Sequence, residues 1–189
     1  MTTLIVILAV IAVVVFYGIA IYNSLVDKRA RCEEAWSGIE VQLKRRHNLI
    51  PNLVETVKGY ASHESETLEN VSKARNSAIA ADSNNPAETA ATEGILTGAL
   101  RQIFALSEAY PDLKANTNFL DLQEQLQALE DEIQMARRFY NGSARDYNVL
   151  VDSFPSNLIA GKFQFEKRDY FELDPAEAAE VRKVPKVSF

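Results

Sequence analysis

The 189-residue sequence has few of the residues on which many enzymes and nucleotide-binding proteins depend. It contains 7 glycines, 2 histidines and 1 cysteine, and its net charge is −6. The glycines form neither a G-x-G-x-x-G nor a G-x-x-x-x-G-K motif, which argues against the common phosphate-cradling loops. One cysteine excludes an intrachain disulfide. The acidic balance argues against general nucleic-acid binding, so we predict no nucleic-acid partner.

Candidate catalytic residues are equally scarce. Cys32 has no evident base beside it, and we interpret it as a small apolar helix residue. A metal site would draw on His47, His63 and Glu64, but the residue four after His63 is Thr67, so the H-E-x-x-H pattern fails. We expect His63 and Glu64 to be adjacent on a helix and to diverge by about a quarter turn. We therefore predict no catalytic, cofactor-binding or metal site.

A long apolar run dominates what is present. Residues 4–22 contain no charge, no proline and one glycine. As an α-helix they would rise about 28 Å, the thickness of the hydrocarbon core of a bilayer. The alternative is a cleavable signal peptide, for which residues 18–20 offer a weak cleavage-like site. Signal peptides usually have a basic start and a shorter apolar run, so we predict a retained membrane anchor that contacts the lipid bilayer through residues 4–22.

The basic residues around this run predict its orientation. Lys28, Arg29 and Arg31 follow it closely, and no basic residue precedes it. Lys and Arg near the end of a span tend to stay on the cytoplasmic side. We therefore expect a single-pass protein of the bacterial inner membrane, with a short N-terminus outside and everything after Asn23 in the cytoplasm.

The next part of the chain continues with helical spacing. Its apolar face recurs every three or four residues, as in a coiled coil: Cys32, Trp36, Ile39, Leu43, Arg46 and Ile50. Pro51 predicts a kink or short break at residues 47–52, because proline removes a helix hydrogen bond. The pattern then resumes and continues to the turn signal at residues 82–86.

Two more helices are expected after that turn. The first covers residues 89–109, with Ile95, Ala99, Ile103 and Leu106 as its apolar stripe, and ends before Pro111. The second is capped by Asn116 or Thr117 and ends at Pro155. Its apolar positions are Phe119, Leu122, Leu126, Leu129, Ile133, Ala136, Tyr140, Tyr147, Leu150 and Phe154, with Ser143 as a weak member.

Charged residues also lie among these stripes. Glu130 and Arg137 could face Arg46, Arg75 or Glu108 across a bundle. Ion pairs of this kind fix register and partner choice, and we favour that role over acid–base catalysis.

The predicted fold is all-α, with an N-terminal transmembrane helix continuing into an antiparallel bundle of long helices, similar to a four-helix bundle. We divide the chain into an anchor at residues 1–23, a bundle at residues 24–155 and a C-terminal segment at residues 156–189 that packs on the bundle. Within that segment, residues 174–175 should open a short helix at residues 176–181, and the end should be frayed. No convincing strand or internal repeat is visible.

Several separate stretches resemble the bacterial LemA family. They are YNSLV at 22–26, RRHNLIPNLVETVKGYASHE at 45–64, VSKARN at 71–76, EAYPDLKANTNFLDLQ at 108–123 and ARRFYNGSARDYN at 136–148. Their order and spacing agree with the family, and together with the anchor they cover nearly the whole chain. The resemblance implies a single-pass inner-membrane protein with a cytoplasmic helical bundle. It implies no biochemical activity that can be assigned to a residue.

Two classes of function follow from these observations. The favoured one is a membrane-anchored helical scaffold or adaptor without catalysis, which forms homo-oligomers or binds unidentified membrane or cytoplasmic proteins. The alternative is a metal-dependent membrane-bound enzyme that uses His47, His63 and Glu64. The absence of catalytic constellations and the wrong ligand spacing favour the scaffold.

Overall fold

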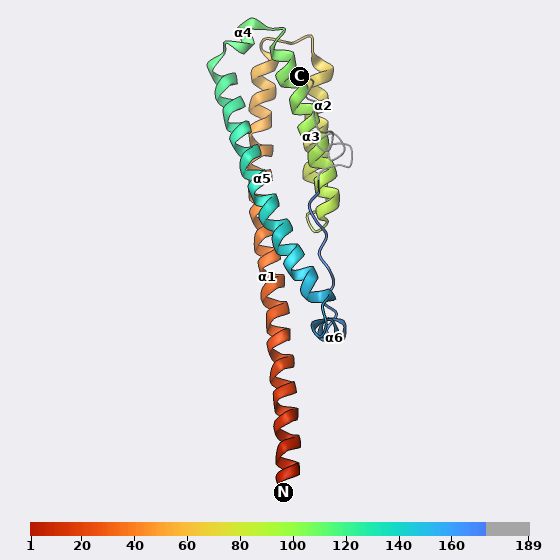
Figure 1. Ribbon diagram of the computed structural model, residues 1–189. Coiled ribbons are helices and arrows are strands. Elements are labelled where there is room, and N and C mark those ends of the chain that lie inside the picture. Colours follow the sequence, from red (N-terminus) through yellow and green to blue (C-terminus); the bar gives the residue numbers. More distant parts are fainter. Residues whose placement is uncertain (173–189) are drawn as a thin grey trace, which may run out of the picture. The chain divides into compact units, whose positions relative to one another are not determined.

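A computed structural model describes residues 1–172, and these residues form helices and connecting segments, with no strand in that range (Figure 1). The helices are α1 (Thr2–Lys58), α2 (Ser65–Ala80), α3 (Pro86–Ser107), α4 (Pro111–Lys114), α5 (Thr117–Asp152) and α6 (Ser156–Lys162). The predicted all-α class is confirmed. The short helix and frayed end predicted at residues 174–189 lie outside the described residues.

The chain forms two compact units, and the long helices α1 and α5 contribute to both. The first unit holds Met1–Gly38 and Arg138–Arg168, and the second holds Ile39–Arg137 and, among the described residues, 169–172. The predicted division at residues 23 and 155 separates parts by role rather than by packing, and it stays a prediction.

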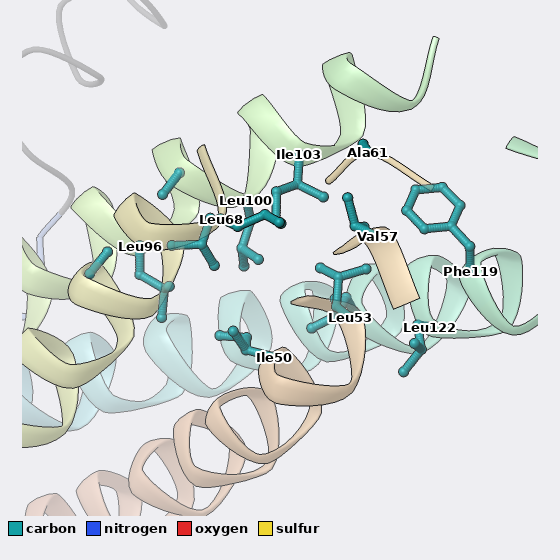
Figure 2. Packing of buried hydrophobic residues seen from close by; sticks show 14 of the residues in the cluster. Ile50, Leu53, Val57, Ala61, Leu68, Leu96, Leu100, Ile103, Phe119 and Leu122 are labelled. Carbon is teal, nitrogen blue, oxygen red and sulfur yellow. The ribbon is translucent and has the colours of Figure 1, made fainter. Parts of the chain in front are cut away.

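The second unit is the helix bundle that the sequence predicts. Consecutive long helices in it run in opposite directions (Figure 1), and α2 and α3 lie side by side. Its core draws apolar side chains from α1, α2, α3 and α5, with Leu113 of α4 closing one end. Figure 2 shows part of this core: Ile50, Leu53, Val57, Ala61, Leu68, Leu96, Leu100, Ile103, Phe119 and Leu122.

Helix caps explain where α3 and α5 begin. The side-chain oxygen of Asn116 accepts a hydrogen bond from the backbone N–H of Phe119 at 3.0 Å, which confirms Asn116 as the cap of α5. Asn85 caps α3 in the same way, accepting from the N–H of Glu88 at 3.1 Å. Each cap satisfies a backbone donor that the first turn of a helix leaves unpaired.

The break after α1 falls in a different place from the predicted one. The sequence predicts a kink or a short break at residues 47–52; helix α1 continues through Pro51 without a break, and the kink stays a prediction. The chain instead leaves the helix after Lys58, at Gly59, and turns through residues 60–64 before α2. Glycine weakens a helix and is common just past its end, whereas Pro51 lies on an exposed face where its ring is accommodated.

Two predicted apolar positions also prove to be exposed. Ile95 is 63% exposed, whereas Ala99 and Ile103 of the predicted stripe are buried together with Leu96 and Leu100, so the buried face of α3 is shifted toward Leu96 and Leu100. Phe154 is 80% exposed because α5 ends at Asp152, before the predicted seam does. The remaining members of the α5 stripe are buried or half-buried.

In the first unit, α1 packs against α5 through aromatic and small side chains. The rings of Trp36 and Tyr140 lie 5.2 Å apart, and Cys32 and Tyr147 are buried between the helices. Burial raises the pKa of the Cys32 thiol, so this thiol stays protonated and apolar, as the sequence predicts. The segment after α6 is held by Asn148, which donates to the carbonyl of Arg168 at 2.8 Å and accepts from its N–H at 2.8 Å.

The start of α1 differs from all other helical segments. Side chains of residues 4–17 are exposed, although nearly all are large and apolar. Helix α1 is the one helix within residues 1–172 that is long and apolar enough to cross a membrane, by length and composition.

Candidate functional site

Five polar side chains meet inside the second unit. Arg46 and His47 come from α1, Glu93 and Thr97 from α3, and Glu130 from α5; we call these five residues the Arg46 cluster. Arg46 occupies a position of the apolar stripe of α1, so the helix carries its guanidinium into the bundle. Arg46 is only 3% exposed and Glu93 only 5%, so both charges are removed from water and need partners.

The geometry of the Arg46 cluster satisfies most of these groups. Arg46 donates from Nη1 to Glu130 Oε2 at 2.8 Å and to Thr97 Oγ1 at 3.1 Å. Its Nη2 pairs with the carboxylate of Glu93 and donates to the backbone carbonyl of Glu93 at 3.3 Å. The second carboxylate oxygen of Glu93 lies 2.7 Å from His47 Nε2. One guanidinium therefore links three helices.

The environment of Glu93 favours its ionised form. Burial alone would raise the pKa of the Glu93 carboxyl, but the hydrogen bond with His47 and the charge of Arg46 outweigh it. The pKa of Glu93 consequently lies below its ordinary value. Arg46 Nε is buried and makes no hydrogen bond among the described residues. The arrangement is typical of a structural ion-pair network, in which removal of one partner leaves another buried charge unpaired.

A cleft of about 360 Å³ opens beside the Arg46 cluster within the second unit. Its charged lining mixes three guanidinium groups, from Arg46, Arg101 and Arg137, with carboxylates that include Glu93 and Glu130. The guanidinium carbon of Arg137 lies 5.1 Å from the ring centroid of Phe171. The described lining includes no Ser, Cys or His. Within the cleft, Arg46 pairs with the carboxylates of Glu93 and Glu130.

The residues considered for a metal site take three different environments. His47 belongs to the Arg46 cluster, and His63 is exposed in the turn between α1 and α2 rather than on a helix, which corrects the sequence interpretation. Glu64 lies in the same turn and accepts a hydrogen bond from the hydroxyl of Tyr110 at 3.1 Å. Within residues 1–172, no group of three His, Cys, Asp or Glu side chains could hold a metal ion.

Arg75 makes a contact that explains how α1 passes through Pro51. Proline has no N–H, so the carbonyl of His47, four residues earlier, cannot receive its helix hydrogen bond from residue 51. Arg75 of α2 donates from Nε to this carbonyl at 2.7 Å. A side chain of the neighbouring helix therefore supplies the donor that the proline removes.

Sequence reasoning found part of this site and missed its centre. It named Glu130 and Arg46 as candidates to face each other, and they do. It did not single out Glu93, because the stripe chosen for α3 ran through Ile95 and left Glu93 outside. The signal that could have found it is the spacing of Glu93 with Ala90, Leu96 and Leu100, which places a carboxylate on an otherwise apolar face.

Comparison with known proteins identifies the family. The family model described as "LemA family" matches residues 35–189. The chain belongs to the LemA family. Among curated proteins, Protein LemA of Metamycoplasma hominis is 28% identical over 179 residues, covering 93% of this chain and 78% of that protein. Magnetosome protein MamQ 2 of Paramagnetospirillum magneticum is 25% identical over 196 residues, covering 90% of this chain and 72% of that protein.

The stretches that resemble the LemA family carry much of the site just described. Arg46, His47 and Pro51 lie in the stretch at 45–64, and Arg75 lies in the stretch at 71–76. Their contacts join α1 to α2, α3 and α5. In this LemA-family chain the polar residues of these stretches therefore hold helices together, so their role here is structural.

Proposed function

We propose that this LemA-family chain is a membrane-anchored helical scaffold or adaptor without catalytic activity. Its bundle would bind copies of itself or partner proteins, and the chain would lie in the inner membrane as a single-pass protein with the bundle in the cytoplasm. This function rests on the combination of an apolar helix start, a bundle and buried charges that pair with one another.

The observation that carries the proposal is a single helix with two kinds of apolar surface. Side chains of residues 4–17 in α1 are exposed, and a surface of this kind is stable against lipid rather than water. Further along the same helix, Leu43, Ile50 and Leu53 face the bundle core. Both surfaces belong to one continuous helix.

The interior of the bundle supports a structural rather than a catalytic role. Glu93 binds both Arg46 and His47, and such networks fix the register of helices. The metal-enzyme alternative finds no support in the positions of His47, His63 and Glu64. Metal analysis of the purified protein should detect no stoichiometric transition metal, and a bound equivalent would favour that alternative instead.

Membrane anchoring is tested by washing membranes with alkaline carbonate. The protein should stay in the membrane pellet, and its intact mass should correspond to the uncleaved chain of 21.1 kDa. A species that lacks the first twenty or so residues, about the length of a signal peptide, would indicate cleavage and contradict the anchor.

Self-association is the part of the proposal that bears on scaffolding. Confinement to a bilayer raises the local concentration, so weak contacts between copies would be populated. Cross-linking in membranes at native expression level, followed by mass measurement of the detergent-extracted protein, should give a discrete oligomer. An unrelated single-pass protein at equal density controls for random collisions. A single monomeric species in both assays would contradict self-association and leave an adaptor for other proteins.

A further inference from the structure

Helix α6 and the residues after it pack on the end of the apolar stretch of α1, within the first unit. A Cβ added to Gly18 would lie 3.9 Å from Ile159 Cδ1 of α6. The ring of Tyr22 lies 4.9 Å from that of Phe163 and 5.6 Å from that of Phe165. The last turn of the candidate membrane span is therefore covered by a segment that comes from the far end of the chain.

The outward surface of this segment is apolar. Phe154 is 80% exposed, Leu158 63% and Phe163 52%, all within ten residues. Exposed large apolar side chains this close together in the sequence are typical of surfaces that bind a protein or a membrane. The segment is folded, because Ser156 and Ala160 are buried and the Ser156 hydroxyl donates to the carbonyl of Leu150 at 2.6 Å. The exposure therefore belongs to an ordered surface.

The depth of the contact with α1 indicates what covers this surface. Gly18 lies four residues before Tyr22, which is about 6 Å inside the end of a span at residues 4–22. A side chain that contacts Gly18 must then lie at the boundary between acyl chains and headgroups when the span crosses a bilayer. Interfacial helices bury their apolar face about 5–10 Å into that boundary, and aromatic residues are enriched there.

Basic side chains accompany the aromatic ones. Lys162 Nζ lies 5.9 Å from the ring centroid of Phe163, and the guanidinium carbon of Arg29 lies 5.2 Å from that of Phe165. Cations placed beside apolar rings suit a membrane surface, where rings enter the boundary and cations meet anionic headgroups. Continuity with the span and this charge pattern favour lipid over a second protein as the occupant.

We infer that residues 154–163 form a second membrane contact, which lies in the interface of the leaflet where the span ends at Tyr22. The chain is then held by a span and by an interfacial wedge, and the wedge fixes the rotation of the span about its own axis. This inference rests on the proposed function, since it requires residues 4–22 to cross the bilayer.

Fluorescence quenching by brominated phospholipids tests the inference on the full chain. A Trp36→Phe background removes the one native tryptophan, and Leu158→Trp then places a reporter on the wedge. Ile95→Trp is the matched control, because Ile95 is also 63% exposed but lies in the second unit. Phe16→Trp reports on the span itself. Each variant is reconstituted into vesicles brominated either near the headgroups or near the middle of the acyl chains.

The inference expects strong quenching of the Leu158→Trp variant by bromine near the headgroups and weaker quenching by bromine at mid-chain. The Ile95→Trp variant should be quenched by neither lipid. Quenching at position 16 without quenching at position 158 overturns the wedge and leaves the anchor standing. Absence of quenching at position 16 overturns the anchor and the wedge together. A Leu158→Trp reporter shielded from both lipid bromine and aqueous acrylamide would mean a protein contact, which also overturns the inference.

Discussion

At the scale of single residues, Glu93 holds the charges inside the second unit together. Its carboxylate accepts from Arg46 with one oxygen and contacts His47 with the other. Replacement by glutamine keeps the shape but leaves Arg46 with Glu130 as its one carboxylate in the cluster. Removing one partner of a buried ion pair costs about 3–5 kcal/mol, and we expect Glu93→Gln to lie near the lower end of that range.

Thermal unfolding followed by circular dichroism measures this effect. The Glu93→Gln variant should melt well below the wild type, because a bundle of this size has a total stability of only about 5–15 kcal/mol. Glu124→Gln is the matched control, since Glu124 is exposed on α5 and its replacement should leave the melting temperature nearly unchanged. Equal melting temperatures for the two variants would contradict a stabilising role of the Arg46 cluster.

The lowered pKa of Glu93 adds a pH dependence with a defined sign. In the unfolded chain the carboxyl titrates near its ordinary value of 4.5, and in the folded chain it titrates lower. Its contribution to stability is complete above pH 4.5 and is lost as the pH falls through the folded pKa. The difference in melting temperature between wild type and Glu93→Gln should therefore narrow below pH 4.5. If this difference in melting temperature stayed constant on acidification, the stabilisation would come from a group other than the Glu93 carboxylate.

Pro51 and Arg75 should be coupled through the carbonyl of His47. In the wild type, Arg75 supplies the donor that proline lacks, whereas Pro51→Ala would provide a backbone N–H of its own. Arg75→Ala should therefore cost more stability in the Pro51 chain than in the Pro51→Ala chain. We expect a coupling of about 1 kcal/mol in a double-mutant cycle of thermal or urea unfolding. Additive effects would show that the Arg75 contact does not compensate for the proline.

Individual residues show which contacts could be predicted from the sequence and which could not. Arg46 was visible as a charge on an apolar stripe, so its burial and its pairing could be anticipated. The partner Glu93 depended on the rotation of a different helix, which local spacing left ambiguous. The passage of α1 through Pro51 depended on Arg75, a residue 24 positions later whose approach is set by tertiary packing.

At the scale of elements, the rotation of α3 about its axis predicts how two isoleucine substitutions affect stability. Ile103 is fully buried and Ile95 is 63% exposed, although both belong to the same predicted stripe. Ile103→Ala should destabilise the protein by about 2–5 kcal/mol, because the deletion leaves a cavity in the core. Ile95→Ala on the same helix removes the same atoms from the surface and should change stability by about 0.5 kcal/mol or less. If both variants lost a comparable free energy of unfolding in urea, Ile95 would have to be buried, as the sequence predicted.

Helix ends were predictable where side chains mark them and were missed where they do not. Asn85 and Asn116 bind the first turns of α3 and α5, and both ends lie within a few residues of the predicted ones. The end of α1 has no such marker except Gly59, and the stronger signal of Pro51 drew the predicted break away from it. Proline acts on one hydrogen bond, whereas the turn at residues 59–64 connects α1 to α2, whose Arg75 contacts α1.

At the scale of the whole molecule, the class of fold was predictable because every long helical segment after residue 23 has one apolar stripe. Such stripes have few ways to be buried other than in a bundle. The grouping of residues into two units was not predictable, because α1 and α5 run continuously through both units. No composition shift marks residue 38 or residue 138. Local patterns show where helices lie, but the packing along a long helix depends on partners that are distant in sequence.

Orientation in the membrane is a property of the whole chain that a few charges should control. Lys28, Arg29 and Arg31 follow the span, and the three side chains before it carry no charge. Because basic residues tend to stay on the cytoplasmic side, protease added to intact spheroplasts should leave the bundle uncut. Replacing the three basic residues with glutamine and adding lysine at Thr2 and Thr3 should invert a fraction of the molecules, whose bundle then becomes cleavable from outside.

A control variant must separate the effect of losing basic residues from the effect of where those residues lie along the chain. Lys58, Lys73 and Lys114 are exposed basic residues far from the span, so replacing these three with glutamine removes the same number of basic side chains from the part of the chain after the span. That control should stay protected from external protease, because charges distant from a span have little effect on its orientation. Unfolding would also expose cleavage sites, so circular dichroism of each variant must match the wild type. Cleavage of the wild-type bundle in intact spheroplasts would reverse the predicted orientation, and equal inversion of both variants would remove local charge as its cause.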